Sequence, residues 1–155
     1  MKLNWFSSLP PIRSKIAEYT KQVLPCLSNH ADVIIWTEQE SWDTELENFA
    51  QVYHYHPHTI PWDVINQGDI NLYHIDNHPN FQQNVRDISR HCPGLVILHE
   101  INLHRCFSAI YLNSDGDLTT LALENAAGVI VHNQKAYNLL KQDKTRFTGY
   151  IPLPY

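Results

Sequence analysis

Short apolar runs recur along the chain and alternate with stretches that have helical spacing. We predict strands at 32–36, 51–56, 70–75, 95–99 and 128–132, with a first strand at 3–8 and a last one beginning at Phe147. The runs at 33–36, 95–98 and 129–131 are apolar at every position, which is typical of strands buried on both faces. The pattern therefore predicts an α/β fold, a Rossmann-like three-layer α/β/α sandwich with a mostly parallel sheet.

Helices are predicted in the segments between these runs. The segment 12–27 carries apolar residues three and four positions apart: Ile12, Ile16, Tyr19, Val23 and Leu27. Pro25 is expected to end or kink this helix, because proline removes a backbone donor. Further helices are predicted at 81–91, 118–126 and 134–142. Two prolines, Pro152 and Pro154, follow the last strand and predict an extended linker.

Composition narrows the class of protein. A length of 155 residues with 43% hydrophobic content predicts one Rossmann-like domain, 1–155. The formal charge of -5 and the pI near 6.0 argue against a nucleic-acid partner, which needs a basic surface. We find no signal peptide and no apolar run long enough for a membrane span, so we expect a cytoplasmic protein. The three cysteines are odd in number and widely spaced, and we interpret them as reduced thiols.

Polar residues follow several predicted strands. In open parallel sheets, ligands bind outside the carboxyl ends of the strands, so we expect the clusters 7–15, 76–78, 99–100 and 132–133 to meet at one edge. In the first cluster, Ser14 either caps the following helix or helps to bind an anionic or hydroxyl-rich ligand at its N-terminus. The chain has no Gly-x-Gly-x-x-Gly motif, so NAD binding is not predicted.

His99 is the first candidate for chemistry. It follows the apolar run 95–98, where its imidazole could accept a proton or bond a sugar hydroxyl, and Glu100 could orient it or bind hydroxyls itself. The alternative is a core histidine that a backbone carbonyl satisfies.

Other histidines raise the question of a metal. His99 and His104 are five positions apart, whereas the zinc-protease helix needs histidines four apart. His54 and His56 would share one face of an extended strand, as two metal ligands can. A surface strand end followed by a loop that includes His58 is the alternative interpretation of that segment.

The ordered clusters resemble the N-terminal domain of family-4 retaining glycosyltransferases, which have the GT-B architecture of two facing Rossmann-like domains. The resemblance lies in five stretches that span most of the chain: 8–11 with 16–19, 73–77, 93–100 with His104, 127–133, and 151–154.

The resemblance implies a set of site residues. His99 corresponds to the family's active-site histidine near the reacting sugar, with Glu100 as a second catalytic residue, and 11–16 to the loop beside the donor phosphates. The implied acceptor- and donor-binding residues are Pro11, Ser14, Lys15, Ile16, Asn77, His78, His104, His132 and Asn133. Lys15 and Asp76 depart from the family, which commonly has glycine at these two places, and each adds a side chain near the ligand.

The resemblance also implies the reaction. A sugar would pass from a nucleotide-sugar donor to a carbohydrate or lipid-linked acceptor with retention, without a metal or further cofactor. The family's C-terminal nucleotide-sugar-binding domain, which supplies groups for the diphosphate, is absent from these 155 residues, so we expect negligible transfer by this chain alone and a weak homodimer through the uncovered face.

Two alternatives remain open at this point. A non-catalytic carbohydrate-binding or interaction module with the same fold would bury or block His99, whereas a transferase half would expose it to a cleft. A metal-dependent hydrolase built on the histidines would instead carry a bound metal ion.

Overall fold

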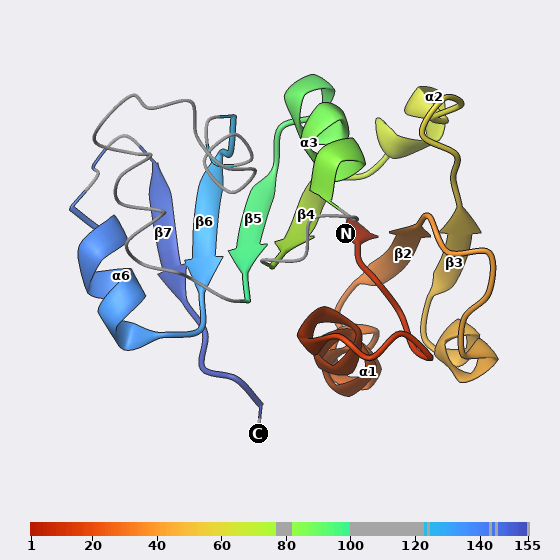
Figure 1. Cartoon of the computed structure of the whole chain (residues 1–155), viewed down its shortest axis with the longest axis horizontal. Coiled ribbons are helices and arrows are strands. Elements are labelled where there is room, and N and C mark those ends of the chain that lie inside the picture. Colours follow the sequence, from red (N-terminus) through yellow and green to blue (C-terminus); the bar gives the residue numbers. More distant parts are fainter. Residues whose placement is uncertain (77–81, 100–122, 124, 143, 145, 155) are drawn as a thin grey trace. The chain divides into compact units, whose positions relative to one another are not determined.

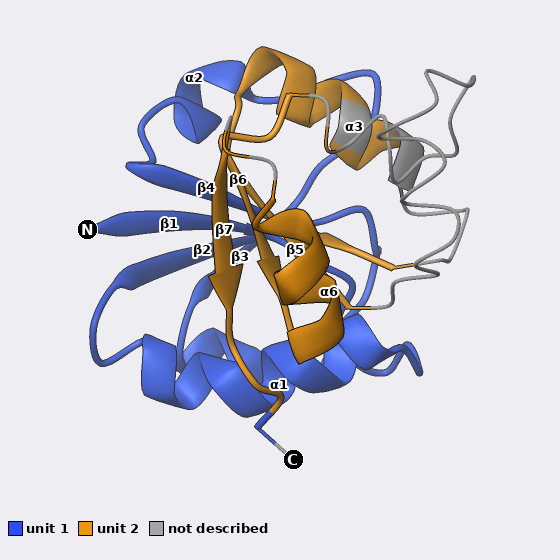
Figure 2. Cartoon of the chain, turned by 90° about the vertical axis from the view of Figure 1, so that its left-hand side faces the viewer, with its two compact units in different colours: residues 1–72, 154–155 blue, residues 73–153 orange. Residues whose placement is uncertain are grey.

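A computed structural model describes residues 1–76, 82–99, 123, 125–142, 144 and 146–154. The chain divides into two compact units, one formed by residues 1–72 with 154–155 and the other by 73–153 (Figure 2).

The first unit is built on parallel strands connected by helices. Its elements are β1 (Lys2–Phe6), α1 (Lys15–Leu27), β2 (Asp32–Thr37), the 3-10 helix η1 (Thr44–Asn48), β3 (Gln51–His54) and α2 (Trp62–Ile65) (Figure 1). Its strand order is β3-β2-β1, with Trp5 paired with Ile35 and Ile35 with Val52. Strand β4 (Ile70–Ile75) begins in this unit and continues into the second.

A buried asparagine organises the core of the first unit. The Asn4 side-chain oxygen accepts a hydrogen bond from the Trp36 indole N–H at 2.9 Å, and its amide donates to the Ile65 carbonyl and the Asn71 side-chain oxygen, both at 2.7 Å. These bonds offset the cost of burying an amide. A Cβ atom at Gly68 would collide with the Asn4 side-chain amide, so a larger residue there would have to displace this hydrogen-bonded group.

Helix α1 begins later than the sequence pattern predicts, and it ends at the predicted residue, Leu27. It starts at Lys15 rather than Ile12, because Ser14 has extended backbone geometry and caps the helix. Of the two effects expected of Pro25, ending or kinking the helix, the first does not occur, since the helix continues to Leu27. Pro25 is exposed and lies in the last turn, so only one helical donor is lost, and the Ser28 N–H still bonds the Leu24 carbonyl at 3.0 Å.

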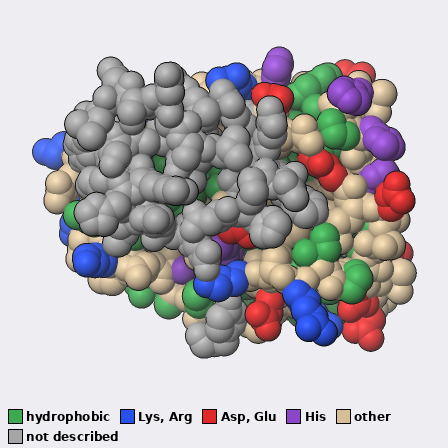
Figure 3. Space-filling view, in the orientation of Figure 1, with side chains coloured by type: hydrophobic (Ala, Val, Ile, Leu, Met, Phe, Trp, Pro, Cys, Tyr) green, Lys and Arg blue, Asp and Glu red, His purple; other side chains and the backbone are tan. Residues whose placement is uncertain are grey.

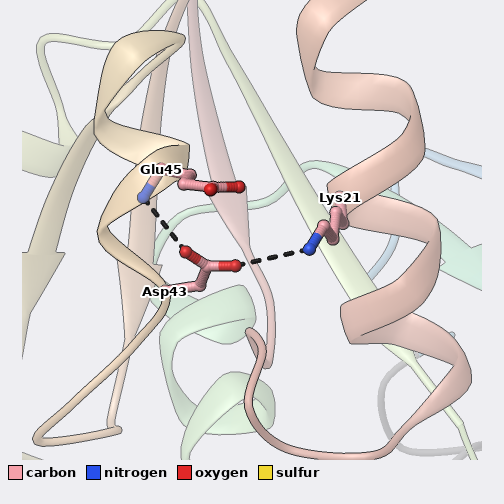
Figure 4. Close-up of polar contacts among 3 residues, drawn as sticks. All are labelled: Lys21, Asp43 and Glu45. Carbon is pink, nitrogen blue, oxygen red and sulfur yellow. Dashed lines mark hydrogen bonds and ion pairs between the residues drawn. The ribbon is translucent and has the colours of Figure 1, made fainter.

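Asp43 joins η1 to α1 through its two carboxylate oxygens. One oxygen accepts from the Glu45 backbone N–H at 3.1 Å and caps η1, and the other lies 3.4 Å from the Lys21 ammonium on α1 (Figure 4). The lysine is exposed, so the ion pair adds little stability, and the cap is the more important contact.

The second unit repeats the parallel arrangement. It contains the end of β4, α3 (Gln82–His91), β5 (Leu95–Leu98), β6 (Gly128–Val131), α6 (Gln134–Leu140) and β7 (Phe147–Tyr150). The strand order is β5-β6-β7, with Ile97 paired with Ile130 and Ile130 with Gly149. Strand β4 lies beside β5, because the His99 N–H bonds the Ile75 carbonyl at 2.9 Å.

The predicted α/β, Rossmann-like fold is confirmed, since parallel strands and connecting helices form both units. The predicted strands 3–8, 51–56, 95–99 and 128–132 all end one or two residues earlier in the structure, and the predicted helix 134–142 ends at Leu140. The sequence pattern missed η1 and α2. The predicted helix 118–126 lies mostly outside the described residues.

No helix among the described residues is long and apolar enough to cross a membrane.

Candidate functional site

Three histidines gather at the carboxyl ends of three strands in the second unit. His74 is the last residue but one of β4, His99 directly follows β5, and His132 directly follows β6. Carboxyl ends of neighbouring parallel strands meet at one edge, which is where open α/β sheets bind their ligands. The prediction that His99 and His132 come together is therefore confirmed.

The three imidazoles form a row with His99 in the middle. The Nδ1 atom of His74 lies 2.9 Å from Nε2 of His99, and the two rings stack at 5.2 Å between centroids with 28° between their planes. The His99 and His132 ring centroids are 4.9 Å apart. The alternative interpretation of His99 is a core histidine that bonds a backbone carbonyl. Its Nε2 atom instead faces the imidazole of His74.

A backbone carbonyl sets the tautomer of His132. Its Nδ1 atom lies 2.7 Å from the carbonyl oxygen of Ile151, which directly follows β7 and bonds through its own N–H to the Val131 carbonyl at 3.0 Å. A carbonyl can only accept, so Nδ1 carries the hydrogen. A neutral imidazole protonated at Nδ1 has its lone pair on Nε2, which can therefore accept a hydrogen bond.

Burial keeps all three rings uncharged at neutral pH. The pKa of His74 lies well below its ordinary value because the ring is buried and because His99 and His132 lie close by. Burial, and then His132, lowers the pKa of His99 to about 3. Burial also lowers the pKa of His132, although the bond to the Ile151 carbonyl acts in the opposite direction. The cluster can exchange hydrogen bonds, but it supplies no positive charge.

His74 is a member of this cluster that the sequence analysis did not select as a site residue. It lies inside the apolar run 70–75 rather than after it, and its side chain is only 4% exposed. The sequence signal that could have identified His74 is an imidazole within a strand expected to be buried. A buried polar ring needs a hydrogen-bond partner, so such a residue is expected to contact another polar group.

The predicted residues of the first cluster lie in the first unit. Ser14 caps α1 as one of its two interpretations predicts: its hydroxyl accepts from the Ala17 N–H at 3.0 Å and lies 2.8 Å from the Ser8 hydroxyl. Pro11 and Lys15 are exposed, whereas Ile16 is buried in the core at 5% exposure. Their convergence with the histidines of the second unit stays a prediction.

Asn133 is also a helix cap. Its side-chain oxygen accepts from the N–H groups of Lys135 at 2.8 Å and Ala136 at 3.2 Å, at the start of α6. This places the cap one residue after His132 and fixes the turn from β6 into the helix. Four other predicted site residues lie outside the described residues: Asn77, His78, Glu100 and His104.

The segment around His54 is a surface strand end and loop, as one of its two interpretations predicts. His54, His56 and His58 are all exposed. Within the described part of the chain, no three side chains among histidine, cysteine, aspartate and glutamate are grouped to hold a metal ion. Cys26 lies on the surface and Cys92 in the core, whereas Cys106 lies outside the described residues, so the predicted reduced state of the three thiols stays a prediction.

Comparison of the chain with protein-family models, with curated proteins and with solved structures gives no significant match. The resemblance to family-4 glycosyltransferases therefore rests on the quoted residues alone.

Proposed function

We propose that this chain is the acceptor-binding half of a retaining glycosyltransferase that uses a nucleotide-sugar donor. In this proposal, His99 and His132 contact sugar hydroxyls beside the reacting carbon, with Glu100 next to them. The observation that supports the proposal is the row of three imidazoles at the carboxyl ends of β4, β5 and β6.

The chemistry of neutral imidazoles suits a sugar ligand. Each neutral ring has one donor and one acceptor nitrogen, and sugar hydroxyls can both donate and accept. With a pKa near 3, His99 is a poor general base at neutral pH, so its proposed task is to bind and orient a hydroxyl.

The same electrostatics bear on catalysis. Departure of a nucleoside diphosphate needs cationic groups or helix dipoles aimed at the phosphates, and three neutral imidazoles provide no charge of that kind. We therefore propose that a second domain supplies those groups and that this chain alone transfers no sugar.

One observation favours the second candidate, a non-catalytic carbohydrate-binding or interaction module. His99 is only partly exposed, and its Nε2 atom already faces His74. In that case the fold would bind a saccharide or a partner without positioning a reacting carbon.

A binding titration tests the proposal. We expect nucleotide sugars or free saccharides, added as a panel to the isotope-labelled chain, to shift the ring resonances of His99 and His132. His99→Ala and His132→Ala should each weaken that binding by roughly tenfold or more, the effect of losing a buried bond to a ligand hydroxyl. His30→Ala, at an exposed position in the first unit, is the matched control and should bind as the parent chain does.

The outcomes separate the candidates. Absence of any shift across the panel would contradict a sugar site at these histidines. Saccharide binding without any shift from nucleotide sugars would favour the non-catalytic module, and measurable sugar transfer by this chain alone would contradict the need for a second domain.

A further inference from the structure

We infer that His54 and His56 form a surface site for a divalent transition metal ion of the copper and zinc class. This site lies in the first unit and does not depend on the proposed sugar chemistry. Its basis is the placement of two exposed imidazoles on one face of the chain where β3 ends.

The alternation of an extended chain brings the two rings together. His54 is the last residue of β3, and His56 follows two positions later, so both side chains leave the same face. Their ring centroids are 5.1 Å apart, with 69° between the planes. In Figure 3, histidine side chains gather on the side of the molecule where β3 lies, with acidic side chains nearby.

Tyr55, between them, points the other way and anchors the segment. It is 4% exposed, its hydroxyl donates to a Glu38 carboxylate oxygen at 3.0 Å, and its ring packs edge-on against Phe6 at 6.3 Å. The two imidazoles are therefore held on the solvent side by a buried residue that cannot turn outward without losing these contacts.

Backbone hydrogen bonds hold the segment between the two histidines and after the second. The Tyr55 N–H bonds the Thr37 carbonyl at 3.0 Å, which extends the pairing with β2 beyond the end of β3. The Thr59 N–H bonds the His56 carbonyl at 3.0 Å in a tight turn. A metal ion would thus meet two donors on an ordered backbone, which lowers the entropic cost of binding.

The ring separation fits coordination to one ion. Two imidazoles that bind a tetrahedral centre with metal–nitrogen distances of about 2.0 Å have ring centroids about 5 Å apart. The observed centroid separation of 5.1 Å matches this value. Both rings are exposed, so water can complete the coordination sphere and the ion can exchange with solvent.

The donor set and the charge indicate the class of ion. Imidazole nitrogen suits copper, zinc and nickel, and the order of divalent affinities places Cu²⁺ first. The net charge of -5 favours cations in general, although it does not select among them. We expect Cu²⁺ to bind more tightly than Zn²⁺ at this pair.

Calorimetry with CuCl₂ or ZnCl₂ and the metal-free full chain, in a buffer that does not coordinate metals, tests the site. We expect the tightest Cu²⁺ site to weaken at least about tenfold in His54→Ala and in His56→Ala, because each change removes the intramolecular second ligand. The electron paramagnetic resonance spectrum of bound Cu²⁺ should show two imidazole nitrogens in the parent chain and fewer in either variant.

Two other exposed histidines of the same unit serve as controls. His30→Ala, elsewhere on the surface of the same unit, and His58→Ala, in the adjoining turn, should both keep the parent affinity. Circular dichroism confirms that each variant is folded. The inference is overturned if the His54→Ala and His56→Ala double variant binds Cu²⁺ as tightly as the parent chain, or if His58→Ala loses as much affinity as either single variant.

Discussion

The buried ring of His74 positions the ring of His99. The bond between His74 Nδ1 and His99 Nε2 is 2.9 Å long, and His74 is almost fully enclosed, so its ring has little room to turn. The central imidazole of the row is therefore oriented from behind by a residue that lies within β4. Whichever nitrogen carries the shared hydrogen, the bond restricts His99 to one ring orientation.

Replacing His74 tests this positioning. His74→Leu should change the tautomer and ring shifts of His99 in long-range ¹H–¹⁵N spectra, and the lost bond should lower the free energy of unfolding by about 1–3 kcal/mol. His74→Asn can return a polar atom near the former Nδ1 position and should restore the ring shifts in part. Unchanged His99 shifts in a folded His74→Leu chain would show that His74 does not orient the ring.

At the scale of single elements, side-chain caps decide where helices begin. Ser14 starts α1, Asp43 starts η1 and Asn133 starts α6, and each offers an oxygen to a backbone N–H in the first turn. Two of these caps, Ser14 and Asn133, lie within the clusters that the sequence pattern associated with ligand binding. The structure therefore gives Ser14 and Asn133 a structural role that is independent of any ligand.

Substitution of the α1 cap should have a measurable cost. Ser14→Ala removes the acceptor for the Ala17 N–H and should lower the free energy of unfolding by about 1 kcal/mol. Ser14→Asp keeps a side-chain acceptor and should retain most of the stability that the cap contributes. Ser28→Ala, at the partly exposed other end of the helix, is the matched control and should cost less. Urea denaturation measures all three, and equal stability of Ser14→Ala and the parent chain would contradict the capping role.

At the scale of the whole molecule, the three buried histidines make stability depend on pH. Their pKa values are lower in the folded than in the unfolded chain, so the unfolded chain binds more protons at mildly acidic pH. Stability is therefore complete above the unfolded value of about 6.5 and is lost as the pH falls toward the folded values.

Urea titrations from pH 7.5 to pH 5 test this dependence. For each histidine that stays neutral in the folded chain, the free energy of unfolding should fall by about 2 kcal/mol as the pH drops from 7.5 to 5. We expect His99→Asn to reduce the pH slope and His30→Ala, at an exposed position, to leave it unchanged. A free energy of unfolding that does not fall between pH 7.5 and pH 5 would contradict the neutral, buried state of the cluster.

The pattern of apolar and polar residues determined much of the secondary structure and part of the site. Continuous apolar runs identified β2, β5 and β6, and the helical spacing identified α1, because these patterns reflect local burial. The positions of His99 and His132 at strand ends followed from the same runs. The short elements η1 and α2 escaped notice because four or five residues are too few to display a period.

Only the tertiary structure decided which side chains meet. The pairing of His74 with His99 depends on how β4 and β5 are aligned, and the tautomer of His132 depends on the Ile151 carbonyl beyond β7. The lowered pKa values likewise arise from burial by residues distant in the chain. Hydrophobic periodicity records which positions avoid water, but it does not record which strands become neighbours, and the neighbouring positions of β4, β5 and β6 bring these rings together.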